Sequence, residues 1–338
     1  GDRRAAQAAG REGGGEAAPA APEGTLNRLD LARWLVAPEN PLTARNLMNR
    51  LWAQFFGAGI SARVEDLGLQ GEWPTHPELL DWLAVEFRDS GWDLKHMVRL
   101  IVMSATYRQD SVPSARALEV DPQNRLLSRQ SPRRLDAEFV RDNALSIAGL
   151  INLDLGGPSI FPYQPAGYYA TLQFPDRDYH RSPDERQYRR GVYMHWQRTF
   201  LHPMLANFDA PTREECIAGR LVSNTPQQAL TLLNDPSHVE AARVLAANLL
   251  RDGRDDARRL TLAFERALAR APRPAERDGL LALLERQRNH YRANEAEARA
   301  LMANGLAPVP AGMDKAELAA WTQVCRVILN LHETITRY

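Results

Sequence analysis

The sequence predicts a mainly α-helical protein with one small β element and one long irregular loop rich in glycine, proline and tyrosine. In most segments, apolar residues recur at every third or fourth position, which is the periodicity of a buried helix face. Many of these segments begin with a capping residue or with proline at the first helical position. Alternating β-type residues stand out in "RGVYMHWQR" (190–198), which is the expected strand.

Four helices are expected in the first third of the chain, over residues 26–36, 44–57, 76–91 and 93–109. Thr25 is the predicted N-cap of the first helix, and Thr43 opens the second. Pro77 occupies the first position of the third helix, and Asp93 caps the fourth. The expected inner stripe of the third helix consists of Leu80, Leu83 and Phe87.

A fifth helix is expected over 131–151, with Ser131 as its cap. The segment 152–190 that follows carries no helical stripe, and an irregular loop of that length in a compact domain is usually functional. The expected strand comes next. The remaining helices are expected over residues 225–233, 236–250, 257–269, 274–300 and 315–336.

Composition along the chain predicts its domain organisation. Residues 1–24 consist mainly of Gly, Ala, Pro and charged residues without apolar periodicity, so they are predicted to form a disordered interdomain linker. Residues 25–338 are predicted to form a helical domain. A sub-boundary is placed near residue 251, with a C-terminal helical part over 254–338.

Charge, hydropathy and cysteine content argue against several classes of function. The 42 basic residues match 42 acidic ones, so no global positive field recruits nucleic acid or an anionic membrane. No apolar run reaches the roughly 18–20 residues that span a bilayer, and the start of the chain has no signal-peptide pattern. Cys216 and Cys325 form neither a C-x-x-C nor a C-x-x-C-H motif, so no haem attachment and no Cys-based zinc site is expected. Two free thiols and a single disulfide both stay open.

A series of longer motifs occurs in a specific order along the chain. They are "NPLTARNLMNRLWAQFFGAGI" (40–60), "GLQGEWPTHPELLDWLAVEF" (68–87), "LIVMSATYRQ" (100–109), "DPQNRLLSRQSPRRLDAEFVRD" (121–142), "GGPSIFPYQP" (156–165), the stretch 202–235 and "AAWTQVCRVILNLHETITRY" (319–338). In this order they resemble the family called DUF1553 or PSD1, over roughly residues 25–338.

The resemblance implies a context rather than a reaction. Domains of this family typically follow a DUF1549 domain, often with a haem-binding cytochrome-like domain before it, in exported proteins of Planctomycetes and related bacteria. The implied partners are these upstream domains of the same polypeptide, and the implied location is the periplasm or the cell surface. Haem is expected only on the separate upstream domain, with no cofactor in this chain. The family has no established activity, so no catalytic residues are carried over.

The stretch "HPMLANFDAPTREECIAGRLVSNTPQQALTLLND" (202–235) is unusually polar. Thr212 and Glu215 have the spacing of a capping box for a helix over 213–220, and Thr225 is a cap followed by proline. Two helix N-termini close together favour an anion or a polyol. Capping leaves four residues of the stretch without a role, namely His202, Asp209, Arg213 and Arg220.

A ligand- or partner-binding site is therefore predicted where this stretch meets the 156–190 loop, and a structural switchback between helices is the alternative. Loop aromatics are more often contact residues than core residues. The spacing of His195, His202, Asp209, Glu214 and Cys216 matches no standard ligand motif, so no metal site is expected. The candidate site residues are His195, His202, Asp209, Arg213, Glu214, Arg220, Asn224, Arg134, Tyr163 and Tyr168.

Two classes of function follow from these observations. In the first, the chain is the substrate- or partner-engaging part of an exported, cytochrome-linked protein, an oxidoreductase that acts on carbohydrate. In the second, it is a non-catalytic helical scaffold that organises neighbouring domains. Whether the candidate residues converge on a pocket or spread over a face separates the two hypotheses.

Overall fold

The computed structural model describes residues 26–171, 178–197, 200–252 and 255–338. It confirms the mainly helical prediction, and the named strands of the described ranges are two short ones. The chain divides into two compact units, residues 1–109 with 125–127 and residues 110–124 with 128–338. The predicted linker over 1–24 lies outside the described residues.

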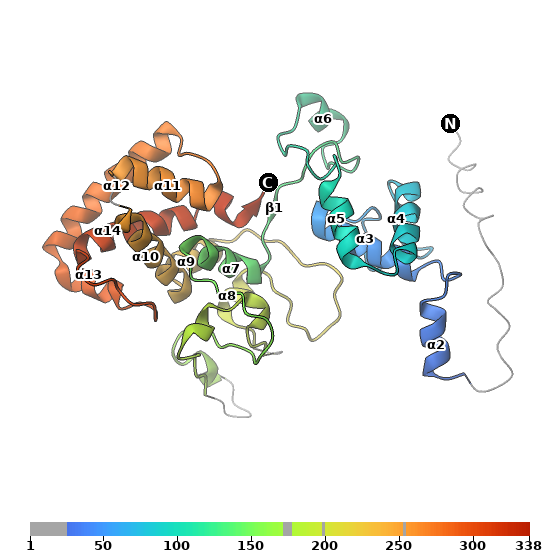
Figure 1. Ribbon diagram of the computed structural model, residues 1–338, viewed down its shortest axis with the longest axis horizontal. Helices are drawn as coiled ribbons and strands as arrows, with labels where there is room; N and C mark the ends of the chain where they lie inside the picture. Colours follow the sequence, from blue (N-terminus) through green and yellow to red (C-terminus); the bar gives the residue numbers. More distant parts are fainter. Residues whose placement is uncertain (1–25, 172–177, 198–199, 253–254) are drawn as a thin grey trace. The chain divides into compact units, whose positions relative to one another are not determined.

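Four helices form the first unit, and three of them enclose its core (Figure 1). They are α2 (Arg28–Leu35), α3 (Thr43–Phe56), α4 (Pro77–Asp89) and α5 (Leu94–Met103). The predicted stripe of α4 is confirmed, because its three side chains are buried. Asp93 caps α5 as predicted, and its carboxylate accepts hydrogen bonds from the amides of Lys95 and His96. The cap of α2 is Asn27 rather than the predicted Thr25, because Asn27 forms a reciprocal capping box with Asp30.

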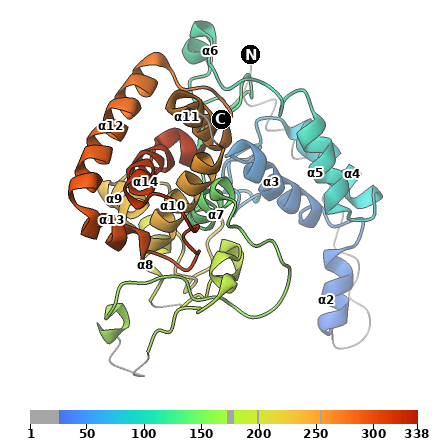
Figure 2. The ribbon, with the colours of Figure 1, turned by 60° about the vertical axis from the view of Figure 1, so that its left-hand side comes forward.

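The second unit is built around α14 (Lys315–Leu329), which packs against α10 (Pro236–Arg251) and α12 (Pro274–Ala293) (Figure 2). Trp321 and Cys325 of α14 are fully buried in this core. Asp235 caps α10 as predicted, because its carboxylate accepts from the amide of Ser237. The other α-helices of this unit are α6 (Ala115–Val120), α7 (Ala137–Ala148), α8 (Pro203–Asn207), α9 (Pro226–Asn234), α11 (Asp256–Leu268) and α13 (Glu295–Met302).

The predicted strand over 190–198 is wrong. Residues Gly191–Tyr193 form the 3-10 helix η3, and Met194 makes an isolated bridge to Ile160, while Arg198 lies outside the described residues. Gly191 lies tightly against the backbone of Glu138, so this segment packs on α7 instead of pairing with a strand. The remaining 3-10 helices are η1 (Tyr168–Thr171), η2 (Glu185–Tyr188) and η4 (His332–Ile335).

The observed sheet joins two short strands, of which the first and the initial residue of the second were predicted to be helical. Strand β1 (Arg133–Arg134) pairs antiparallel with β2 (Thr336–Arg337). The helix predicted from Ser131 therefore begins only after Asp136, and the helix predicted to end at 336 ends at Leu329. Pairing between distant parts of the chain competes here with local helix propensity.

One more predicted helix differs in the structure, and one predicted domain boundary can be located on it. The helix predicted over 274–300 is interrupted at Asn294, where α12 ends and α13 begins. The predicted sub-boundary near 251 falls between α10 and α11. Both helices contribute buried side chains to the same hydrophobic core as α14.

Candidate functional site

Arg134 and Asp209 form the centre of a hydrogen-bonded clamp. The Arg134 guanidinium donates to the Asp209 carboxylate at 2.7 Å and to the carbonyl of Phe208 at 3.2 Å. The amide and hydroxyl of Ser223 also donate to Asp209, both at 2.8 Å. Burial alone raises the pKa of Asp209, but the hydrogen bonds from Ser223 and Arg134 hold it below its ordinary value. This clamp ties the two ends of segment 209–223 to β1.

The helix predicted over 213–220 is wrong, because segment 211–225 is irregular in the structure. Arg213 has a left-handed backbone (φ 63°), which interrupts a helix, and its guanidinium stacks on the ring of Trp196 at 3.8 Å. Arg220 donates two hydrogen bonds to Glu138 at the start of α7, at 2.6 and 3.1 Å. Both arginines thus have partners within the protein.

His202 is a buried structural residue. Its Nδ1 accepts from the amide of Met204 and so caps the short helix α8, while its Nε2 lies 2.8 Å from the carbonyl of Tyr163 and donates to it. Burial lowers the pKa of His202, although the nearby charge of Asp235 opposes this shift. The imidazole is therefore held in its neutral form.

The other candidates occupy different surroundings. The ring of His195 stacks on Phe161 at 4.6 Å, and the hydroxyl of Tyr168 donates to the carbonyl of Leu201 at 3.1 Å. Glu214 and Asn224 are exposed. The structure therefore brings Arg134 together with Asp209 and His202 together with Tyr163, and it distributes the remaining candidates over other contacts. That these residues form a ligand site stays a prediction.

Replacing His202 by Asn should reduce the loss of stability that accompanies acidification. Above the ordinary histidine pKa of 6.5 both the folded and the unfolded chain carry neutral imidazole, so the full stability is present there. As the pH falls, the unfolded chain binds the proton first, because the folded-state pKa of His202 is lowered. Asn retains an N-cap acceptor for the amide of Met204.

Urea denaturation at about pH 7.5 and about pH 5.5 measures this effect around the ordinary pKa. The wild type should lose more stability between the two pH values than His202→Asn does. A pH dependence that is the same in both proteins would contradict the assignment of a neutral, buried imidazole.

Glu240 is a fully buried acid that the sequence analysis did not single out. Its carboxylate accepts from the hydroxyls of Tyr163 and Tyr188 at 3.0 and 2.7 Å and from the amides of Leu306 and Ala307 at 2.6 Å each. Arg243, also fully buried, lies 3.8 Å away. Burial and the charge of Glu240 raise the pKa of the Tyr163 hydroxyl, so this tyrosine stays protonated. The signal in the sequence was an acid and an arginine three residues apart in a helix rich in Ala, Leu and Val.

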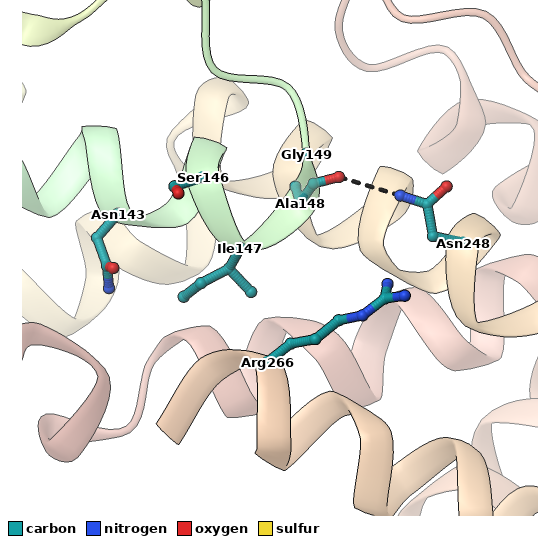
Figure 3. Close-up of a pocket in the computed structure, with 7 residues that line it drawn as sticks. All are labelled: Asn143, Ser146, Ile147, Ala148, Gly149, Asn248 and Arg266. Atoms are coloured by element: carbon teal, nitrogen blue, oxygen red, sulfur yellow. Dashed lines mark hydrogen bonds between the residues drawn. The ribbon is translucent and has the colours of Figure 1, made fainter. Parts of the chain in front are cut away.

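A groove of about 620 Å³ lies where the C-terminal end of α7 meets α10 and α11. Figure 3 shows Arg266 extending from α11 toward the side chain of Asn248 and the end of α7. Asn248 donates to the carbonyl of Ala148 at 3.1 Å. The lining residues are Asn143, Ser146, Ile147, Ala148, Gly149, Asn248 and Arg266.

Several polar side chains that line this groove have hydrogen-bonding groups without a partner in the described part of the chain. In the described part of the chain Arg266 makes no hydrogen bond or ion pair, and the same holds for the hydroxyl of Ser146. The amide nitrogen of Asn143 donates to the carbonyl of Thr334 at 2.7 Å, and among the described residues its side-chain oxygen meets no hydrogen-bond donor. None of these residues was a sequence candidate, because packing of three separate helices brings them together.

The cysteines, the potential metal ligands and the lengths of the helices bear on the corresponding sequence predictions. Cys216 is exposed and Cys325 is buried, and both are free thiols. Among the described residues, three or more His, Cys, Asp or Glu side chains do not gather in a group that could hold a metal ion. In that same part of the chain, the helices are too short or too polar to cross a membrane.

Comparison with known proteins identifies a family but no characterised relative. No curated protein and no solved structure matches the chain. The model of the family PSD1, described as a protein of unknown function (DUF1553), matches residues 27–284. Because this match covers well over half of the sequence, the chain belongs to the PSD1 (DUF1553) family.

Proposed function

We propose that this chain is the ligand-engaging part of a larger protein and that its ligand is a carbohydrate bound in the groove at the end of α7. The observation that carries the proposal is the Arg266 guanidinium, which faces the groove without a partner in the described part of the chain. Arg266 is exposed, and its guanidinium presents five N–H donors in a fixed plane to a ligand that enters the groove.

A hydroxyl-rich ligand suits the groove because the groove presents both donors and acceptors. Arg266 donates, the oxygen of Asn143 accepts, and the hydroxyl of Ser146 does both. The end of α7 adds the partial negative charge of its last carbonyl groups, which favours a neutral ligand with hydroxyl donors over an anion. Ile147 provides an apolar surface for the C–H groups of a sugar ring.

The resemblance to cytochrome-associated proteins extends the proposal to a cellular context. In this view the protein is exported, the groove presents carbohydrate, and any oxidation takes place through haem on an upstream domain. This part of the proposal is tested in the full-length polypeptide, by following reduction of its haem spectrum on addition of a panel of oligosaccharides and polysaccharides. A haem spectrum that stays oxidised with every carbohydrate counts against the redox role.

Arg266→Ala should weaken carbohydrate binding about tenfold or more, because it removes charge-assisted hydrogen bonds to the ligand. Binding to a panel of neutral and acidic oligosaccharides, measured by calorimetry, checks this. Arg258→Ala is the matched control, because Arg258 is also exposed on α11 but is paired with Glu265. Equal affinity of wild type and Arg266→Ala for every bound oligosaccharide would show that carbohydrate does not bind in this groove.

A helical scaffold is the second candidate function, and a specific observation favours it. Arg134, Asp209, Arg213 and Arg220 are satisfied by partners within the protein, as expected of a structural switchback. A wild-type protein that binds no oligosaccharide of the panel would favour this second candidate.

A further inference from the structure

Helix α2 exposes apolar side chains in a way that is unusual for a folded protein. It buries none of its eight residues. Leu29, Leu31, Trp34 and Leu35 are between 41% and 56% exposed. An isolated helix of this length is marginal in water, and helices with this apolar content are normally covered. Within the described part of the chain, no surface covers this helix.

The direction of α2 is nevertheless defined by bonds to the rest of its unit. The side chain of Asn40 donates to the carbonyl of Trp34 at 3.2 Å and accepts from the amides of Leu42 and Thr43 at the start of α3. Arg88 of α4 donates to the carbonyl of Pro38 at 2.7 Å. Both ribbon views show α2 standing apart from α3, α4 and α5 (Figures 1 and 2). These bonds fix the end of α2 and the loop that follows it, while the side chains of α2 stay exposed.

The outer face of α4 has the properties of a partner for such a helix. Trp82 and Val85 are 50% and 44% exposed and lie three residues apart on this face. Glu78 and Asp89 lie on the same face, four residues before Trp82 and four after Val85. Helix α2 carries Arg28 and Arg33, whereas its one acid, Asp30, is engaged in the capping box. Asp89 lies 3.7 Å from Arg88 of its own helix, so the charge complementarity rests on Glu78 opposite Arg28 and Arg33, beside two apolar surfaces.

We propose that the partner is a second copy of this chain, with α2 of each copy packed on α4 of the other. Since both surfaces belong to one chain, a two-fold axis makes each contact twice and closes the assembly. The pair of contacts covers four half-exposed tryptophans and the leucines around them. A fully covered aromatic side chain buries about 150–250 Å², and because each tryptophan is already half covered it adds roughly half of that, to which the leucines and Val85 add their exposed area. The assembly therefore approaches the roughly 1,000 Å² at which specific interfaces begin.

The first test is the molar mass of the whole chain in solution, measured by light scattering behind size-exclusion chromatography. We expect a dimer at tens of micromolar, and we expect Trp34→Glu and Trp82→Glu to be monomeric with unchanged circular dichroism. Trp73→Glu is the matched control, because Trp73 is 70% exposed in a loop of the same unit, so this variant should stay dimeric. A wild-type monomer across the concentration range overturns the proposal.

The second test distinguishes α2–α4 pairing from α2–α2 pairing. Mixing Trp34→Glu with Trp82→Glu leaves one intact contact, between α2 of the second chain and α4 of the first. We therefore expect the mixture to form heterodimers, more weakly than the wild type, while each variant alone remains monomeric. Dimers of Trp82→Glu alone, together with monomers of Trp34→Glu, would show that α2 pairs with α2 and would overturn the proposed arrangement.

Discussion

Glu240→Ala should cost the second unit about 3–5 kcal/mol of folding free energy, the amount expected when one partner of a buried charge pair is removed. The fully buried Glu240 carboxylate accepts four hydrogen bonds, two from tyrosine hydroxyls and two from backbone amides. Its removal also leaves Arg243 buried without its nearest acid. Arg243 already has two guanidinium nitrogens without a hydrogen-bond partner. Each of these groups loses a compensating interaction in a region that water does not reach.

The measurement should report on the second unit alone, because the chain has two units. Hydrogen exchange of amides in α10 and α14, followed by mass spectrometry with increasing urea, provides this. Glu265→Ala on α11 is the control, because the Glu265 side chain is 44% exposed and its loss should change stability by less than about 0.5 kcal/mol. A Glu240→Ala protein within about 1 kcal/mol of the wild type would show that the network contributes little net stability.

Glu240→Gln should cost less stability than Glu240→Ala but more than Glu265→Ala. The amide oxygen of Gln still accepts from the backbone amides of Leu306 and Ala307, whereas the negative charge beside Arg243 is lost. A loss as large as that of Glu240→Ala would indicate that the charge, rather than the hydrogen bonds, carries the effect.

Local signals in the sequence were sufficient for much of the helical fold. Asp93 and Asp235 cap the helices that they were predicted to cap, and Pro77, Pro226 and Pro236 stand at predicted first positions. These signals work because a cap or a first-turn proline acts within three or four residues of itself. The residues that start such a helix therefore lie within a few positions of the helix itself, where a single sequence reveals them.

Local signals failed where distant residues compete for the same segment. Thr212 and Glu215 have capping-box spacing, yet Arg220 bonds Glu138, which is 82 residues away, and Arg213 stacks on Trp196. Likewise, "RGVYMHWQR" has the alternation of a strand, but Gly191 lies against α7. Side chains that find tertiary partners override the propensity of a short segment.

Neither the groove nor the Glu240 network could be assembled from the sequence. Asn143, Asn248 and Arg266 belong to three helices, and only the packing of those helices places them around one opening. The candidates of the 202–235 stretch were chosen because capping did not explain their polarity. The structure instead satisfies Asp209 and Arg220 through long-range hydrogen bonds, which a single sequence does not reveal.

Gly305→Ala should destabilise the second unit by about as much as Glu240→Ala, although it adds only one methyl group. Gly305 has a left-handed backbone (φ 87°), which costs an L-residue roughly 1–2 kcal/mol. Its added Cβ would also lie well under 3.0 Å from the carboxyl group of Glu240, closer than real Cβ atoms approach. The carboxylate would have to move away from the amides of Leu306 and Ala307, so the substitution adds the loss of these two hydrogen bonds to the backbone strain.

Gly312→Ala separates the backbone cost from the clash. Gly312 lies in the same loop after α13 with a similar backbone (φ 75°), but a Cβ there meets no atom within 4 Å. Its substitution should therefore cost only the roughly 1–2 kcal/mol of left-handed strain. Equal losses for Gly305→Ala and Gly312→Ala, measured by the same hydrogen-exchange experiment, would mean that the Glu240 carboxylate moves aside at no cost.

The two substitutions should also be strongly non-additive. In a Glu240→Ala background the obstructing carboxylate is absent, so Gly305→Ala should cost only its backbone strain, about 1–2 kcal/mol. The double variant is then more stable than the sum of the single effects predicts, by an interaction energy of about 2 kcal/mol or more. An additive cycle would show that the two positions act independently. In that case the fold would require glycine at 305 for its backbone conformation rather than for the space that Glu240 occupies.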